Sequence, residues 1–204
     1  MSHPFAEITF TPAVKALQEK YGSRAQYARM QARGGLAPML GPRESEFLAG
    51  ADSFYLATVG ETGWPYVQHR GGPAGFLKVR SEAQLAFADF RGNLQYVSAG
   101  NVAHDDRASL FVMDYVNRER LKFLGHLRFV DVQDADPGLV AAVTLPGYRA
   151  KVERVATFDV AAFEWNCPQH ITPRFTLAQV DATTRRLRER ITELEGEIQA
   201  LRES

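Results

Sequence analysis

The chain has 204 residues, enough for one large domain with appendages and a substantial hydrophobic core. Hydrophobic residues make up 45% of it and charged residues 24%, and 24 Lys and Arg balance 24 Asp and Glu. This balance excludes an overall attraction to nucleic acid or an anionic membrane, so any bound anion must be held by a local arrangement of residues.

Helical signals come first in the chain. Thr11 is a suitable N-cap and Pro12 suits a first helical position, which together predict a helix. Ser23 can cap a second helix that ends at the glycine pair 34–35, and a third short helical turn is predicted after Pro42.

Alternation of apolar and polar residues in the middle of the chain is typical of strands with one buried face. Six such segments form successive hairpins around short loops such as "ETGW", and a late strand follows: 53–60, 65–70, 75–80, 84–90, 108–115, 120–132 and 154–166. Because few helices intervene, we predict a mainly β protein with flanking helices (α+β), built on a six- to seven-stranded antiparallel split β-barrel.

Two stretches between the predicted strands have helical signals. The apolar spacing of 91–107 predicts a short, interrupted helix that starts after Gly92 and Asn93, and 136–151 reads as a helical excursion.

The last stretch, 177–204, has a heptad pattern with Arg and Glu dense between the seam residues. The seam consists of Val180, Thr184, Leu187, Ile191, Leu194, Ile198 and Leu201. Such a helix needs a partner. We favour self-association over packing on its own barrel, because charges crowd both flanks of a narrow apolar stripe.

These patterns predict an N-terminal helical segment packed on the barrel (1–50), a barrel domain (51–175) and a C-terminal heptad helix (176–204). The single cysteine, Cys167, excludes an internal disulfide and is interpreted as a packed residue before a proline rather than a redox group. Without a signal-peptide pattern or a long apolar stretch, we expect a soluble cytoplasmic protein that binds neither membrane nor nucleic acid.

Familiar catalytic motifs are absent, and the five histidines lack metal-ligand spacing, so no metal is predicted. The stretch "VQHRGGPAGF" (67–76) places polar residues and Arg70 directly before a Gly-Gly-Pro turn. Gly92 and Asn93, at a predicted helix start, can offer backbone N–H groups to a phosphate, with charge added by Arg70 and Arg91. The two parts form a phosphate cradle if their strands are neighbours in the barrel; read separately, each is an ordinary turn with a solvated arginine.

The runs "FYLATVGETGWPYVQHRGGPAGFLKV", "LAFADFRGNLQYVSAGN", "DDRASLFVMDY" and "RLKFLGHLRFVD" resemble the pyridoxamine 5′-phosphate oxidase-like family. More narrowly, they resemble its flavin-nucleotide-binding branch, which has a split barrel that binds flavin mononucleotide (FMN). The resemblance covers most of 10–175. Its most specific part is "HRGGP…G" with "GN" following, and the late "WNCPQHITPRF" is also similar to that branch.

The resemblance implies a homodimer with two FMN molecules at the subunit interface. In it, Arg70, Gly92 and Asn93 would contact the phosphate, and Arg120 the flavin ring. The full set of implied cofactor contacts is Gln68, His69, Arg70, Asp89, Phe90, Gly92, Asn93 and Arg120. From the second subunit, the residues nominated are Asn166, Gln169 and Arg174.

Two departures argue against pyridoxamine phosphate oxidase activity itself. The oxidase has an Arg-Lys pair at the helix start where this chain has "RGNLQY", and an Arg-rich C-terminal strand where this chain has a heptad helix.

The leading hypothesis is an FMN-dependent oxidoreductase acting on an unknown small molecule. Its electron donor would be a reduced nicotinamide, a deazaflavin, or a substrate amine whose electrons pass to oxygen. The alternatives are a non-catalytic flavin-binding module that acts as a carrier, sensor or stress protein, and a split barrel that binds another ligand such as haem.

Overall fold

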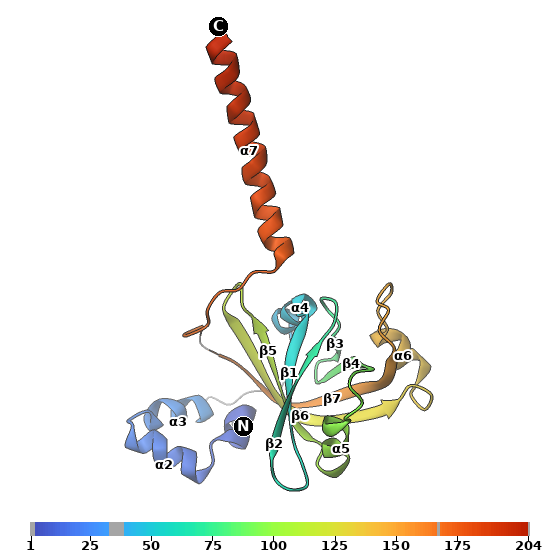
Figure 1. Cartoon of the computed structure of the whole chain (residues 1–204). Coiled ribbons are helices and arrows are strands. Elements are labelled where there is room, and N and C mark those ends of the chain that lie inside the picture. Colours follow the sequence, from blue (N-terminus) through green and yellow to red (C-terminus); the bar gives the residue numbers. More distant parts are fainter. Residues whose placement is uncertain (1–2, 33–38, 167, 204) are drawn as a thin grey trace. The chain divides into compact units, whose positions relative to one another are not determined.

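The structure is a computed structural model that describes residues 3–32, 39–166 and 168–203 (Figure 1). The chain divides into two compact units, one formed by residues of 1–113 and 120–167 and the other by residues of 114–119 and 168–204. Cys167 and the predicted glycine stop at 34–35 lie outside the described residues.

Four helices precede the first strand: α1 (Pro4–Thr9), α2 (Pro12–Lys20), α3 (Arg24–Ala32) and α4 (Pro42–Gly50). Thr11 caps α2 by accepting a hydrogen bond from the backbone N–H of Val14 at 3.4 Å, as its sequence position predicts. Helix α1, which the sequence patterns did not indicate, buries Phe5 and contacts the last strand, β7 (Val152–Trp165). The turn predicted after Pro42 is a full nine-residue helix, α4.

Seven strands form one sheet in the order β2-β1-β5-β6-β7-β4-β3. Their bounds are β1 (Ser53–Val59), β2 (Pro65–Gly71), β3 (Lys78–Ser81), β4 (Gln84–Phe90), β5 (Arg107–Asp114), β6 (Glu119–Asp131) and β7 (Val152–Trp165). The predicted fold class is therefore confirmed, as are the antiparallel hairpins β1–β2 and β3–β4. Strand β3 starts later than predicted, because Gly75, at φ +75°, belongs to the turn before it.

Aromatic side chains fill the core and show how the sheet curls. Phe54 on β1 and Phe87 on β4 meet edge to face with ring centroids 5.1 Å apart, although their strands are not neighbours in the sheet. Both are fully buried, together with Phe123 on β6 and Phe158 on β7. The sheet therefore wraps around a single core, as a split barrel requires.

A bulge bends the two longest strands. The register between β6 and β7 shifts at Leu124 and Gly125. A Cβ atom on Gly125 would lie 2.1 Å from the carbonyl oxygen of Asp159 and 2.8 Å from the ring of Phe158. Only glycine permits this close backbone approach, so the bend depends on residue 125.

The helices after β4 differ from expectation at one point. Helix α5 spans Val97–His104, so it begins later than the predicted start after Asn93. Leu94 and Tyr96 have φ angles of +63° and +54°, which a right-handed helix cannot contain. Helix α6 (Pro137–Val143) lies within the predicted helical excursion.

Helix α7 (Leu177–Glu203) forms most of the second unit (Figure 1). A reciprocal capping box precedes it: Thr176 Oγ1 accepts from the Gln179 N–H at 3.3 Å, and Gln179 Oε1 accepts from the Thr176 N–H at 2.8 Å. None of its residues is buried. Among the described residues, no helix combines the length and apolar character that crossing a bilayer requires.

Candidate functional site

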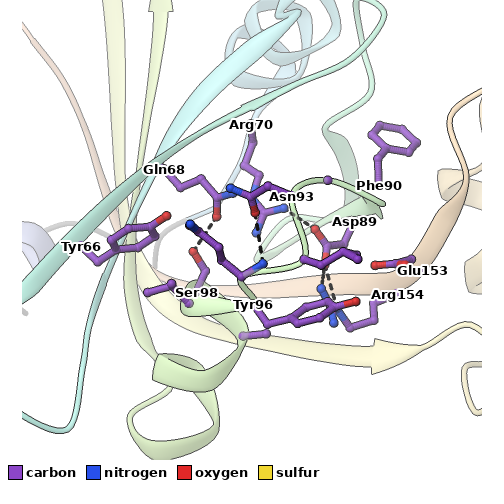
Figure 2. A pocket seen from close by; sticks show the side chains of 15 residues that line it. Tyr66, Gln68, Arg70, Asp89, Phe90, Asn93, Tyr96, Ser98, Glu153 and Arg154 are labelled. Carbon is purple, nitrogen blue, oxygen red and sulfur yellow. Dashed lines mark hydrogen bonds and ion pairs between the residues drawn. The ribbon is translucent and has the colours of Figure 1, made fainter.

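A pocket lies where β2, β4 and β7 meet the start of α5 (Figure 2), and it encloses about 440 Å³ when the part open to solvent is included. Fifteen residues line it: Tyr66, Gln68, Arg70, Asp89, Phe90, Gly92, Asn93, Leu94, Gln95, Tyr96, Val97, Ser98, Ala99, Glu153 and Arg154. The strand end and the loop that the sequence pointed to therefore face each other across one hollow.

Asp89 on β4 anchors the charged groups of this pocket. Its side chain is 1% exposed, and each of its carboxylate oxygens accepts from a different arginine. Arg70 on β2 donates to Oδ1, while Arg154 on β7 donates to Oδ2 from Nε at 2.8 Å and Nη2 at 2.6 Å. Figure 2 shows the two guanidinium groups reaching Asp89 from two sides. Both also lie near the ring of Phe129, with centroid distances of 5.8 and 5.6 Å.

Two guanidinium groups thus share one carboxylate, which leaves positive charge in excess around Asp89. Glu153 also lines the pocket, but its carboxylate lies 3.5 Å from Nε of Arg91. The side chains of Arg70 and Arg154 are only 15% and 18% exposed, so water screens their charge incompletely. Nε of Arg70 is buried and has no hydrogen-bond partner within the part of the chain that the structure describes. An anion would complement this arrangement.

The start of α5 adds backbone donors. Tyr96 is its N-cap, and no side chain of the described residues caps the helix there. The first N–H groups of a helix have no intrahelical acceptor and carry the positive end of the helix dipole, so they attract anions. The left-handed backbone at Leu94 and Tyr96 turns the loop toward this end. Such conformations are uncommon outside glycine and gather at functional sites.

Two hydrogen bonds fix α5 against the barrel. Ser98, which is 1% exposed, donates its hydroxyl to Oε1 of Gln68 at 2.9 Å. Asn101 donates from Nδ2 to Thr58 Oγ1 on β1 at 3.0 Å. The helix start is therefore held in place beside the two arginines.

Of the site residues expected from sequence, the pocket brings together Gln68, Arg70, Asp89, Phe90, Gly92 and Asn93. Gly92 and Asn93 belong to the loop before α5, so the helical donors come from the residues after Tyr96 instead. Asn93 Oδ1 accepts from the Gln95 N–H at 3.2 Å and shapes that loop. Arg91 is outside the lining.

His69 does not line this pocket. Successive side chains of a strand point to opposite faces, so His69 faces away from Gln68 and Arg70. Its ring lies 5.8 Å from that of Tyr55 on β1. The contact of His69 with the cofactor, which the family resemblance implies, stays a prediction.

The remaining nominated residues lie elsewhere. Arg120 is the second residue of β6, and its Nε is buried without a hydrogen-bond partner among the described residues. The same holds for Oδ1 of Asn166, whose backbone N–H donates to the Arg120 carbonyl at 3.1 Å. Gln169 and Arg174 belong to the second unit and are exposed, and Arg174 lies 4.6 Å from the ring centroid of Tyr115. Their contact with a ligand of a second subunit stays a prediction.

Arg154 and Ser98 are among the pocket residues that sequence reasoning missed. Asp89 was itself the signal for Arg154, since a carboxylate within the apolar run "LAFADF" needs a cation, and Arg154 lies directly opposite it on β7. Across residues 3–32, 39–166 and 168–203, no group of three His, Cys, Asp or Glu side chains could hold a metal ion.

A family model described as pyridoxamine 5′-phosphate oxidase matches residues 40–163 of the chain. A comparison with curated proteins finds no match. Among solved structures, HupZ from Group A Streptococcus is similar in fold, with a TM-score of 0.51, 12% sequence identity, and coverage of 67% of this chain and 100% of that chain. An FMN-binding protein from Syntrophomonas wolfei has a TM-score of 0.48 and 13% identity, covering 73% of this chain and 97% of that chain.

Proposed function

This chain belongs to the pyridoxamine 5′-phosphate oxidase family, and from that premise we propose that it is a flavoprotein that binds FMN as a homodimer. The pocket of Arg70 and Arg154 would hold the FMN phosphate. The observation that carries this proposal is the sharing of one buried carboxylate by two guanidinium groups beside a helix start that no side chain of the described residues caps.

The phosphate fits this pocket by charge and by donors. A phosphate monoester carries nearly two negative charges at neutral pH and accepts several hydrogen bonds. Arg70 and Arg154 supply charge-assisted donors, and the buried Nε of Arg70 is still without a partner in the described structure. The backbone N–H groups after Tyr96 add the field of the helix.

Other lining residues would orient the rest of the cofactor. Gln68 has an amide nitrogen available beyond its bond with Ser98, and Asn93 likewise has an amide group at the pocket edge. Such groups suit the hydroxyls of a ribityl chain. Asp89 is a positioning residue, because its oxygens are occupied by the two arginines and hold them in place.

A second copy is the proposed partner of the outer face of the β1–β2 hairpin. In the antiparallel register, Tyr55 lies opposite His69, and Ala57 opposite Val67. Val67 is 60% exposed, and Trp64 on the connecting loop is 75% exposed. An apolar surface beside an open pocket is typical of an interface that completes a site. In such a dimer His69 would face the second subunit, where it could contact FMN as the family resemblance implies.

Bound FMN would supply hydride or electron transfer, so we propose an FMN-dependent oxidoreductase acting on a small molecule. Asp89 is occupied by the two arginines and the buried Ser98 hydroxyl by Gln68, which agrees with side chains that bind and orient rather than act as nucleophiles. The electron donor would be a reduced nicotinamide, a deazaflavin or an oxidisable amine. A reducing compartment, the cytoplasm, suits a chain with one cysteine.

The test is an absorption spectrum of the purified protein, followed by anaerobic addition of NADH, NADPH or a reduced deazaflavin. We expect flavin bands that bleach with one donor, and FMN released on denaturation. Flavin bands that none of these donors bleaches would indicate a protein that binds flavin without catalysing a reaction. A haem-type band without flavin would overturn the proposal.

A further inference from the structure

Helix α7 has an apolar stripe that its own unit leaves uncovered. The apolar residues at seam positions are all exposed, and the least exposed of them, Leu194, still has 40% of its surface accessible. The helix has 27 residues, which corresponds to a length of about 40 Å at 1.5 Å per residue. Stability of a helix in water comes mostly from packing of its apolar face. The stripe of α7 therefore needs an occupant.

The residue types along the stripe favour a particular occupant. Written as heptads, Ile191 and Ile198 occupy a positions, while Leu187, Leu194 and Leu201 occupy d positions. Isoleucine at a with leucine at d is the combination that favours two parallel strands over trimers and tetramers. The stripe thus suits a second helix of the same sequence, side by side and in register.

Charges beside the stripe agree with a parallel pair. Arg190 and Glu197 occupy g positions, and Glu195 and Arg202 occupy e positions. In a parallel pair each g residue faces the e residue of the next heptad on the other helix. Arg190 would then face Glu195, and Glu197 would face Arg202, so both contacts join opposite charges.

Within one helix, Arg190 already contacts acidic residues. Its Nη1 lies 2.8 Å from Glu193 and 4.0 Å from Glu197. All three side chains are more than half exposed, so these contacts are weak and do not hold Arg190 away from a partner.

An antiparallel pair with full overlap is disfavoured by the same residues. Such a pair aligns Leu177 with Leu201 of the other helix. Residues at e positions then lie beside e positions of the other helix, and residues at g positions lie beside g positions. Arg188 would then lie against Arg188, and Arg190 against Arg190 of the other helix. Like charges at these flanking positions repel and set the orientation of coiled coils.

We propose that α7 pairs with the α7 of a second copy as a parallel, in-register, two-stranded coiled coil. The partner is identified by the isoleucine and leucine pattern and by the complementary g and e charges. In this arrangement Thr184, at an a position, lies against Thr184 of the other helix. In the antiparallel arrangement it would lie against Leu194 of the other helix. The proposal does not depend on flavin binding.

Disulfide trapping in the full chain tests the pairing. In a Cys167→Ser background, Thr184→Cys places one thiol on the stripe, and Ala182→Cys places one at an f position on the opposite side as the matched control. At micromolar protein, the millimolar effective concentration within a pair predicts about a thousandfold faster cross-linking for Thr184→Cys than for the control. Equal rates for both variants would overturn the proposal.

A third variant, which carries both Thr184→Cys and Leu194→Cys, reports the relative orientation of the two helices. Identification of its disulfide-linked peptides shows which cysteines have paired. Parallel pairing predicts 184–184 and 194–194 links. Links between 184 and 194 would show antiparallel pairing and would also overturn the proposal. Flavin content, measured on the same samples, is expected to stay unchanged.

Charge exchange gives an independent test that leaves the apolar stripe intact. Arg190→Glu and Glu195→Arg each create like-charged pairs in a homodimer, while a mixed dimer has opposite charges on both sides. The two charge variants are co-expressed, and each also carries Thr184→Cys so that paired chains cross-link. Random pairing would make half of the cross-linked dimers mixed, and we expect the mixed fraction to be well above one half. A mixed fraction at one half would contradict the g and e assignment.

Discussion

Arg70 on β2 is ion-paired with Asp89 on β4, although β1, β5, β6 and β7 all lie between those two strands in the sheet order. The pair joins two distant parts of the sheet where it curls back on itself, next to the core contact between Phe54 and Phe87. One arginine therefore contributes to the closure of the barrel and, under the proposed function, to phosphate binding.

Replacing Arg70 by alanine should weaken FMN binding and lower stability together. Loss of a charge-assisted contact of about 1.5–3 kcal/mol predicts at least a tenfold weaker FMN affinity. Asp89 keeps Arg154 as a partner, so we expect a loss of about 1–3 kcal/mol in the free energy of unfolding rather than complete unfolding. Flavin fluorescence titration and urea unfolding measure the two effects. Unchanged affinity in a folded variant would refute the phosphate assignment.

Asp89→Asn separates the positioning of the arginines from their charge. The amide keeps the shape of the side chain but leaves two guanidinium groups near each other without a compensating carboxylate. We expect the midpoint of thermal unfolding of the FMN-free protein to fall, and FMN to raise that midpoint more than in the parent, because the phosphate then supplies the missing negative charge. A smaller rise than in the parent would show that orientation by Asp89 matters more than charge.

Gly125→Ala tests the close approach of β6 to β7 at the bulge between them. The new methyl group would meet the Asp159 carbonyl oxygen and the Phe158 ring, and neither can move without disturbing the β6–β7 ladder. We expect a loss of about 1–3 kcal/mol or more in the free energy of unfolding. Gly100→Ala in α5 is the matched control, since its Cβ meets nothing within 4 Å. That change should be neutral or stabilising by up to about 1 kcal/mol.

Glu44 gives a prediction on pH. Burial alone would raise its pKa, but hydrogen bonds from the Trp165 indole N–H and from the backbone N–H groups of Glu44 and Gly41 outweigh burial and lower the pKa below its ordinary value of 4.5. A carboxyl whose pKa is lower in the folded state stabilises the fold above its unfolded pKa. That contribution should be lost as the pH falls below 4.5 toward the folded pKa.

Tryptophan fluorescence reports this titration. Trp64→Phe leaves Trp165 as the single tryptophan, and its emission should change in the acid range as Glu44 is protonated. Glu44→Gln retains an oxygen that accepts the indole N–H but does not titrate, so the acid change should disappear. An identical pH profile in that variant would assign the change to another group.

Much of the barrel was predictable because strands such as β1 and β6 alternate buried with more exposed side chains. Leu121, Phe123 and Leu127 share a buried face on β6, as their spacing predicts. The same alternation puts His69 on the opposite face of β2 from Gln68 and Arg70.

The start of α5 and the partner of Asp89 were harder to predict. Leu94 and Tyr96 adopt left-handed backbone without being glycine, so no local residue preference announces the late start of the helix. Arg154 is distant from Asp89 in sequence, and only the β4–β7 register brings them together.

The arrangement of Arg70, Arg154 and Phe129 has a consequence for the thermodynamics of ligand binding. Both guanidinium groups are held by Asp89 and lie near the ring of Phe129. Their conformational entropy is therefore lost during folding and not on binding. Under the proposed function, a preorganised pair of this kind would let the FMN phosphate bind with little entropic penalty, which favours tight retention of the cofactor over rapid exchange.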